Sequence, residues 1–278
     1  MIYAWLALLL LLWSTNFIFV KFALRELPVP LILGWRYIFS AICMLPMVTH
    51  LRRPKRLSRV LIVGLLGLVG NQVVFTIGLS KTSVAHAGII TSLSPVLVLV
   101  GSAIAGHERI TAMRLTGVLT AGCGVVLLQF SRGGTGGATP HGDAIMLLSV
   151  LLFAGFNLWG KPIAENIGSQ QFNAISYFAA GVLAIPLAIG TVKSGVHASL
   201  LAWSGVVYMA LASSVAGYLI YAYALRRLPA SRVATVLYLQ PLLASLLAVL
   251  ILGERPGFIF LPAAALVLTG VYIVERQG

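Results

Sequence analysis

The chain has 278 residues, of which 59% are hydrophobic and 9% are charged, and its mean hydropathy is +1.00. A soluble protein of this length would have to expose much of that apolar surface to water, so the composition excludes an ordinary soluble domain. The net charge is +13. Basic loops account for such an excess in a membrane protein, and the sequence holds no aromatic-rich basic module of the kind that binds nucleic acid.

Apolar runs follow one another along the chain, separated by breaks that carry proline, glycine or charge. A helix that spans a bilayer needs about 20 largely apolar residues. The short alternating segments of a membrane barrel are absent from the sequence, and the first run lacks the basic leader of a cleaved signal. We therefore predict an all-α polytopic membrane protein with ten transmembrane helices, at residues 2–24, 29–49, 60–80, 83–106, 112–130, 142–164, 171–192, 199–226, 231–252 and 258–275.

Lysine and arginine indicate the orientation of these helices, because they accumulate in cytoplasmic loops. If the amino terminus is cytoplasmic, most loop Lys and Arg fall on the cytoplasmic side, including the cluster within residues 52–59. The sequence thus predicts a multi-pass membrane protein with both termini in the cytoplasm. The bias changes sides between the halves, since the 52–59 cluster corresponds to a connection that holds only Lys193. We therefore predict two inverted five-helix repeats.

A short phrase that occurs once in each half supports the duplication. Pro95 is followed after twelve residues by Glu108-Arg109, and Pro241 is followed after twelve by Glu254-Arg255. A glycine-rich stretch separates the halves and lacks the Gly-Lys-Ser/Thr ending of a phosphate loop, so we interpret it as a linker. The predicted domains are a first repeat at 1–130, a linker at 131–141 and a second, inverted repeat at 142–278.

These features resemble the drug/metabolite transporter superfamily, and within it the ten-helix bacterial group of metabolite and amino-acid exporters. The resemblance rests on the helix pattern, the twin proline phrases and the motif Trp13-Ser14-Thr15-Asn16-Phe17 that leads to Lys21. Aromatic and other amino-acid exporters are the most similar group. The resemblance implies a secondary transporter that exports amino acids or similar small amphipathic metabolites by alternating access. It also implies a central cavity lined by the first, third, fourth, sixth, eighth and ninth helices.

The candidate cavity residues are aromatic or polar but uncharged. In the first helix, Trp13, Asn16 and Phe17 share one face, although packing between helices explains that pattern equally well. The prolines remove a backbone hydrogen bond in mid-helix, and interruptions at matching places in inverted halves point to a binding site, with a simple kink as the alternative. The full set is Trp13, Asn16, Phe17, Asn71, Phe75, Pro95, Asn157, Trp159, Tyr218, Tyr221, Tyr238 and Pro241.

Four further residues are candidates for coupling or gating. His86 and Arg232 occupy equivalent repeat positions; the histidine either titrates or caps a helix, and the arginine either binds an anion or sets topology. Arg36 and Lys21 lie inside predicted helices, where a charge needs a partner or a route to water. We expect both to extend towards the outer membrane surface.

Other functions fit the sequence less well. All six acidic residues fall at predicted helix ends or in loops, which disfavours a proton-coupled multidrug carrier of the same superfamily. A sugar-phosphate or nucleotide-sugar carrier would need several cations in its cavity. The scattered histidines form no catalytic or metal-binding constellation, so we expect neither an enzyme nor a metal or cofactor. A structural membrane adaptor remains as the alternative outside transport. The expected partners are a small-molecule substrate, with an amino acid preferred, and the lipid bilayer.

Overall fold

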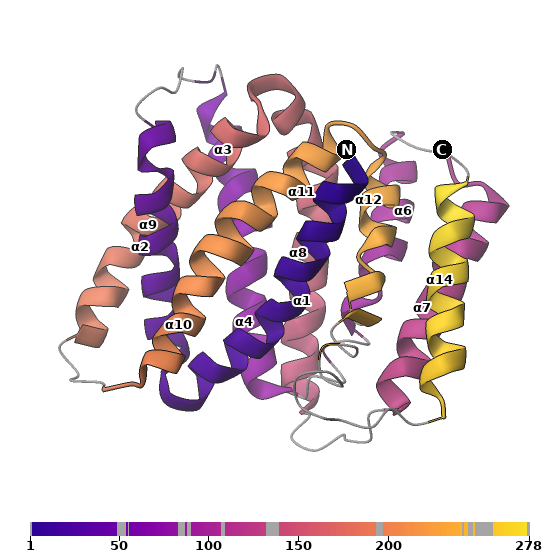
Figure 1. Cartoon of the computed structure of the whole chain (residues 1–278). Coiled ribbons are helices and arrows are strands. Elements are labelled where there is room, and N and C mark those ends of the chain that lie inside the picture. Colours follow the sequence, from indigo (N-terminus) through magenta and orange to yellow (C-terminus); the bar gives the residue numbers. More distant parts are fainter. Residues whose placement is uncertain are drawn as a thin grey trace.

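The described part of the chain forms a bundle of helices in a computed structural model of all 278 residues (Figure 1). Within this part, no segment forms a β-strand. The structure describes residues 2–48, 54, 56–82, 87, 90–106, 109–131, 139–192, 197–240, 242–243, 247 and 258–276.

The first half of the chain contributes α1 (Ile2–Glu26), α2 (Val29–Val48), α3 (Leu57–Ile62), the wider helix η1 (Val63–Gly70), α4 (Asn71–Lys81), α6 (Ser94–Ile104) and α7 (Ala112–Ser131). The second half contributes α8 (Pro140–Ile167), α9 (Ser169–Val192), α10 (Leu200–Tyr208), the wider helix η2 (Met209–Gly217), α11 (Tyr218–Leu225), α12 (Ala230–Val236) and α14 (Phe260–Glu275).

The helical content and membrane character predicted from the sequence are confirmed. By length and composition, six helices of the described part can cross a membrane: Ile2–Glu26, Val29–Met47, Leu57–Lys81, Pro140–Ile167, Ser169–Gly190 and Leu200–Leu225. Each is long enough for the roughly 30 Å hydrocarbon core. The shorter apolar helices Ser94–Ile104, Ala112–Leu127 and Phe260–Glu275 lie alongside them.

Two of these spans contain a wide, π-helical stretch in the middle. In Leu57–Lys81 it is η1, and in Leu200–Leu225 it is η2; both end one residue before a polar side chain, Asn71 or Tyr218. A π-helix opens the backbone to i→i+5 hydrogen bonding and is often found at functional sites. The apolar runs predicted uninterrupted helices at 60–80 and 199–226; in the structure, η1 and η2 interrupt the third and the eighth span.

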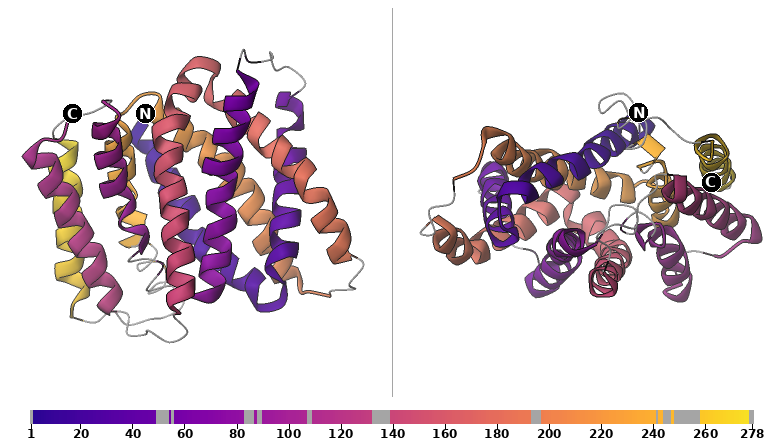
Figure 2. Two further views of the ribbon diagram at one scale, coloured as in Figure 1. Left: turned by 180° about the vertical axis from the view of Figure 1, so that it is seen from behind. Right: turned by 90° about the horizontal axis from the view of Figure 1, so that it is seen from below.

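Helices of one half pack mainly on helices of the other half. α2 packs along α9, α1 along α10, η1 and α4 along α8, α6 against α12, and α7 along α14. In both side views, the α2–α9 pair and the α7–α14 pair lie at opposite ends of the bundle (Figures 1 and 2). The beginning of α1 and the end of α14 lie at the same end of the helices, so the chain starts and finishes on one face (Figure 1).

The fourth predicted helix differs from the single span expected at 83–106. A turn at Ser92 and Leu93 precedes α6, which places Pro95 in the first turn of that helix. Proline fits there because the first backbone N–H groups of a helix have no partner within it. The interruption is therefore a helix start instead of a kink inside a helix. Pro241 and most of the predicted linker, residues 132–138, lie outside the described residues.

The α7–α14 interface depends on glycines that let two backbones touch. A Cβ added at Gly270 would lie 2.3 Å from the Ala121 nitrogen and 2.5 Å from the Gly117 oxygen. One added at Gly124 would lie 2.7 Å from the Val267 nitrogen. In a bilayer the hydrophobic effect does not drive helices together, because lipid is as apolar as the side chains. Small residues therefore stabilise a helix pair by allowing close van der Waals packing of the two backbones.

We expect Gly270→Ala to destabilise the protein by about 1–3 kcal/mol, because backbone atoms of α7 cannot move aside as a side chain can. The measurement is the melting temperature of the detergent-solubilised protein, followed by size-exclusion chromatography. Gly190→Ala is the matched control, since nothing lies within 4 Å of its added Cβ and alanine favours the helix. Equal melting temperatures for the two variants would contradict the close α7–α14 contact.

Candidate functional site

An aromatic cluster lies where α1, α8 and α11 meet. The Trp13 ring lies 5.1 Å from Tyr218 and 5.3 Å from Tyr221, between ring centroids, and 6.3 Å from Phe153. Phe156 adds edge contact to Tyr218 at 5.7 Å. The structure thus brings three predicted cavity residues, Trp13, Tyr218 and Tyr221, into direct contact, although they come from opposite halves of the chain.

Trp13 is positioned by the wide helix η2. A Cβ on Gly217 would lie 2.4 Å from the indole nitrogen of Trp13, so the missing side chain makes room for the ring. The same nitrogen donates a hydrogen bond of 3.1 Å to the carbonyl of Ser213. Gln240 donates to the Trp13 carbonyl at 3.1 Å, which connects α1 to the segment before Pro241. The first contact fixes the indole, and the second fixes the backbone of Trp13, at the junction of the two halves.

Each tyrosine of the cluster bonds to an amide side chain. The Tyr218 hydroxyl donates to Asn71 Oδ1 at 3.0 Å, and the Asn71 amide donates to the Ser149 carbonyl at 2.8 Å. The Tyr221 hydroxyl donates to Asn157 Oδ1 by a short hydrogen bond. Asn71 and Tyr218 each begin the helix that follows a wide stretch, so the two interruptions meet through this bond. The predicted residues Asn71 and Asn157 therefore belong to the same centre.

A second aromatic pair lies beside a buried polar atom. Phe17 and Phe75 contact edge to face at 5.5 Å between centroids. Asn16 is 8% exposed, and its Oδ1 atom has no hydrogen-bond partner in the described structure. A buried acceptor without a donor is costly, and such atoms are commonly satisfied by a ligand or water. Asn16 therefore offers an acceptor for a substrate N–H or O–H group.

Pro95 lies in the first turn of α6, and Tyr238, from the segment after α12, bonds to the turn that precedes it. The Tyr238 hydroxyl donates to the Ser92 carbonyl at 2.8 Å, and both Tyr238 and Pro95 are buried. The hydrogen bond satisfies a carbonyl of the turn that precedes the proline. These two residues are thus joined to each other through the turn, in a contact between α6 and the segment after α12.

The expectation that Arg36 reaches the membrane surface is wrong. Arg36 is only 2% exposed, and its Nε donates to Ser214 Oγ at 2.8 Å. Ser214 Oγ donates in turn to Gln72 Oε1 at 2.9 Å, and Gln72 Nε2 donates to the Tyr177 hydroxyl at 2.7 Å. These hydrogen bonds hold the side chain inside the bundle through its Nε atom. The sequence did not indicate Ser214 as its partner, nor Gln72 and Tyr177 behind Ser214.

Other predicted residues lie apart from this centre or outside the described part. Trp159 is 58% exposed and makes no ring contact with another described aromatic residue, so the structure does not bring it to the cluster. Lys21 lies in α1, but its side chain is not described; His86 and Pro241 are outside the described residues altogether. In the described part, no group of three His, Cys, Asp or Glu side chains is placed to hold a metal.

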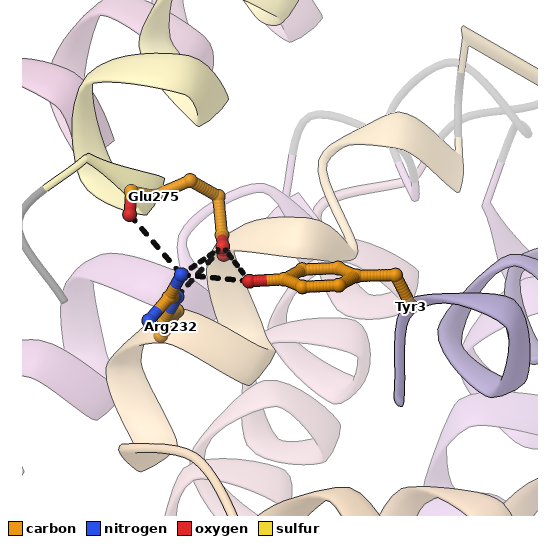
Figure 3. A network of polar contacts seen from close by, with 3 residues as sticks. All are labelled: Tyr3, Arg232 and Glu275. Carbon is orange, nitrogen blue, oxygen red and sulfur yellow. Dashed lines mark hydrogen bonds and ion pairs between the residues drawn. The ribbon is translucent and has the colours of Figure 1, made fainter. Parts of the chain in front are cut away.

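Arg232 forms an ion pair at the end of the bundle where the chain begins and finishes. Its Nη2 lies 2.6 Å from Glu275 Oε2, and Nε donates to the same oxygen at 2.7 Å (Figure 3). The Tyr3 hydroxyl accepts from Arg232 at 2.7 Å and donates to Glu275 at 2.8 Å. This terminal clasp, defined as Tyr3, Arg232 and Glu275, joins α1, α12 and α14. An opening at this end would have to break it.

Comparison with known proteins gives related sequences and a related fold. The model of the EamA-like transporter family matches residues 1–130 and 140–276. An uncharacterized transporter of Archaeoglobus fulgidus is 26% identical, over 98% of this chain and 96% of its own. A probable terminal-alkyne amino-acid exporter of Streptantibioticus cattleyicolor is 25% identical over 81% and 76% of the two chains. A probable amino-acid metabolite efflux pump of Salmonella typhimurium is 24% identical over 96% and 92%.

A solved crystal structure superposes on the chain with a TM-score of 0.82. The superposition covers 99% of this chain and 96% of the other, at 20% sequence identity. This similarity shows that the two chains share a fold.

We expect Glu275→Gln to destabilise the terminal clasp more than Tyr3→Phe, because it leaves the Arg232 charge without its carboxylate. The expected loss is about 1 kcal/mol for Glu275→Gln and less for Tyr3→Phe. Melting temperatures in detergent at low and high salt provide the measurement, and high salt should reduce the effect of Glu275→Gln. Tyr272→Phe is the control, since that exposed tyrosine makes no hydrogen bond through its hydroxyl in the described structure. A larger loss for Tyr3→Phe would contradict the assigned roles.

Proposed function

The chain belongs to the EamA-like transporter family, and from this premise we propose that it is a secondary transporter of the bacterial inner membrane. It exports amino acids or similar small amphipathic metabolites by alternating access. Two proteins that are similar to this chain over most of their length are named a probable terminal-alkyne amino-acid exporter and a probable amino-acid metabolite efflux pump. These names support the proposed substrate class. Family and relatives together indicate a transporter and not an enzyme.

The observation that carries this proposal is the amphipathic centre between the halves. Trp13, Tyr218 and Tyr221 are buried there with their rings in contact, and the unpartnered Oδ1 of Asn16 is a hydrogen-bond acceptor on α1. Aromatic walls with a few polar groups suit a small molecule that has both an apolar part and a polar end. The wide turns of η1 and η2 border this centre, which supports a binding role because such turns recur at functional sites.

The proposed architecture is ten spans in two inverted repeats, divided near residues 131–141. The family model matches two separate stretches, which supports the division. The packing pairs support it as well: α2 with α9, α7 with α14 and α6 with α12 each join equivalent spans. The remaining pairs are α1 with α10, from the first and eighth spans, and α4 with α8, from the third and sixth spans. Exchanging the two halves converts one of these pairs into the other. Inverted repeats of this kind place a substrate site at their interface.

The described charges support amino acids over the other substrates of such carriers. Glu26, Asp143, Glu165 and Glu275 all lie at or near helix ends, so no described carboxylate is placed in mid-span to exchange protons for a cationic drug. Of the charged side chains that the structure describes, Arg36 alone is buried. A phosphorylated substrate would call for several such cations.

We expect both termini to face the cytoplasm. The beginning of α1 and the end of α14 lie at the same end of the helices, and the distribution of Lys and Arg along the sequence assigns that end to the cytoplasm. Fusions of green fluorescent protein and of alkaline phosphatase to each terminus of the full chain measure this. Fluorescence without phosphatase activity is the expected result at both ends. Phosphatase activity at one terminus would contradict an even number of spans, and at both termini it would contradict the charge assignment.

Reconstituted proteoliposomes test transport itself. Counterflow of labelled amino acids, with and without an imposed pH gradient, should be positive for at least one apolar or aromatic amino acid. Absence of counterflow across a broad amino-acid panel would overturn the proposed function. A sugar-phosphate panel is the comparison set, and transport of those compounds alone would favour the other branch of the superfamily.

Within this assay, we expect Trp13→Ala and Tyr218→Phe to reduce initial flux by about tenfold, since each alters the amphipathic centre at a cost of about 1.4 kcal/mol or more in binding. Flux is normalised to the amount of monodisperse protein recovered. Trp5→Ala is the matched control for Trp13, because it removes an exposed tryptophan from the same helix. Unchanged flux in both Trp13→Ala and Tyr218→Phe would remove the cavity assignment.

A further inference from the structure

Arg36 is a buried cation held at one end only. Its Nε atom donates a hydrogen bond to the Ser214 hydroxyl, which donates in turn to the side-chain oxygen of Gln72. The terminal atoms Nη1 and Nη2 donate to no residue in the described part of the chain. Ser214, Gln72 and Tyr177, which follow one another along this chain of bonds, are neutral, so they orient the guanidinium without cancelling its charge.

The carboxylates that the structure describes are engaged elsewhere or exposed. Glu26 accepts two hydrogen bonds of 2.6 Å from Ser199, and Asp143 accepts one from Thr82. Glu275 pairs with Arg232, and Glu165 is exposed near the end of α8. A buried charge without a counter-ion is expensive, so its retention inside a membrane protein indicates a partner that arrives from outside the chain.

The free end of the side chain fits one class of ligand. The two terminal nitrogens of a guanidinium form a planar fork that binds both oxygens of a carboxylate. We propose that Arg36 binds the carboxylate of the transported molecule through Nη1 and Nη2, with Ser214 and Gln72 as positioning residues. The inference rests on the proposed function and narrows its substrate class to molecules with a free carboxylate, as in an amino acid.

Neighbouring residues connect this fork to the aromatic centre. Ser213 accepts the hydrogen bond from the Trp13 indole, and Ser214, the next residue of η2, accepts from Arg36. On the facing span, Asn71 bonds to Tyr218, and Gln72, the next residue, bonds to Ser214. Each span therefore contributes one residue to the aromatic centre and the next to the cationic site. This adjacency suits a small molecule with a carboxylate close to an apolar side chain.

A purely structural role for Arg36 predicts different behaviour. Arg36 would then hold α2 against η2, and ligands with and without a carboxylate would bind equally well. The backbone contact between these elements has its own support, because Ser40 Oγ donates to the Ala210 carbonyl at 3.2 Å. Ligand chemistry on the unaltered protein therefore separates the two roles without any mutation.

The first arm uses the wild-type transporter in proteoliposomes and the amino acid that gives the largest counterflow. Competitors are the same amino acid, its carboxamide, the corresponding amine without a carboxylate, and the corresponding acid without an ammonium group. We expect the amide and the amine to inhibit counterflow at concentrations about tenfold or more above that of the amino acid. Both lack the carboxylate that pairs with the two terminal nitrogens of Arg36. Equal competition by amide and amino acid would overturn the inference and leave the proposed function standing.

The second arm uses substitutions of Arg36. We expect Arg36→Gln to lower the apparent affinity for the amino acid by about tenfold or more, and Arg36→Lys to retain part of it, because lysine keeps the charge but loses the fork. The Arg36→Gln protein should also lose the preference for amino acid over amide. Arg226→Gln is the matched control, as Arg226 is exposed after α11. A preference that survives in Arg36→Gln would overturn the inference.

A third measurement is independent of transport and of the stability of the variants. The melting temperature of the wild-type protein in detergent is measured with 3-phenylpropionate and with phenethylamine, which differ in the charged group. We expect 3-phenylpropionate to raise the melting temperature and phenethylamine to leave it unchanged. If no amino acid shows counterflow, the proposed function fails, while this measurement still decides whether the protein binds a carboxylate. Equal effects of the two compounds, or none from the carboxylate, would overturn the inference.

Discussion

The structure depends on the requirement that polar groups in a bilayer find partners within the protein. The hydrocarbon core offers no water, so the backbone satisfies its own hydrogen bonds in helices, and polar side chains must pair across helices. The hydrogen bond from Tyr218 to Asn71, and from Asn71 on to Ser149, connects three spans in this way. Polar residues thus gather where helices of the two halves meet, which is also where a substrate can be held.

The same requirement gives meaning to two side chains that break it, Asn16 and Arg36. Asn16 Oδ1 is a buried acceptor without a donor, and the terminal nitrogens of Arg36 are donors without an acceptor in the described part of the chain. They are complementary in kind: one suits an N–H or O–H group, the other a carboxylate. An amino acid carries both groups on one carbon. The chain itself supplies the orientation through Ser214 and Gln72, so little has to be ordered when a ligand binds.

Much of the fold follows from the sequence because apolar run length reports directly on membrane spans. The predicted helix at 142–164 corresponds to Pro140–Ile167, and that at 171–192 to Ser169–Val192. The wide stretches η1 and η2 were missed, because a π-helix uses the same apolar residues as an α-helix. Glycines at positions 64, 67 and 70 were the available signal, since Gly67 lets the backbone of Phe156 approach. The turn at Ser92 and Leu93 was missed as well, because the length of an apolar run does not indicate a turn within it.

The candidate site was less accessible to sequence reasoning. Asn71 and Tyr218 were both among the predicted cavity residues, and the structure brings these residues together; their role in binding stays a prediction. Arg36 was misplaced because α2 is apolar on all sides, so its sequence does not tell which face meets lipid. Ser214 and Tyr177 carry no distinguishing pattern, since single polar residues recur in almost every span. Only the three-dimensional arrangement connects them.

The burial of Arg36 also bears on how fast an empty carrier resets. A lone guanidinium in a medium of low dielectric constant carries a desolvation penalty, which a bound anion offsets. If the carboxylate of the cargo pairs with it during the outward step, the loaded protein reorients with its buried guanidinium paired and the empty one with that guanidinium unpaired. The unloaded return then becomes the slower half of the cycle. Cargo present on the far side would accelerate that return, so one internal charge favours exchange over net flow.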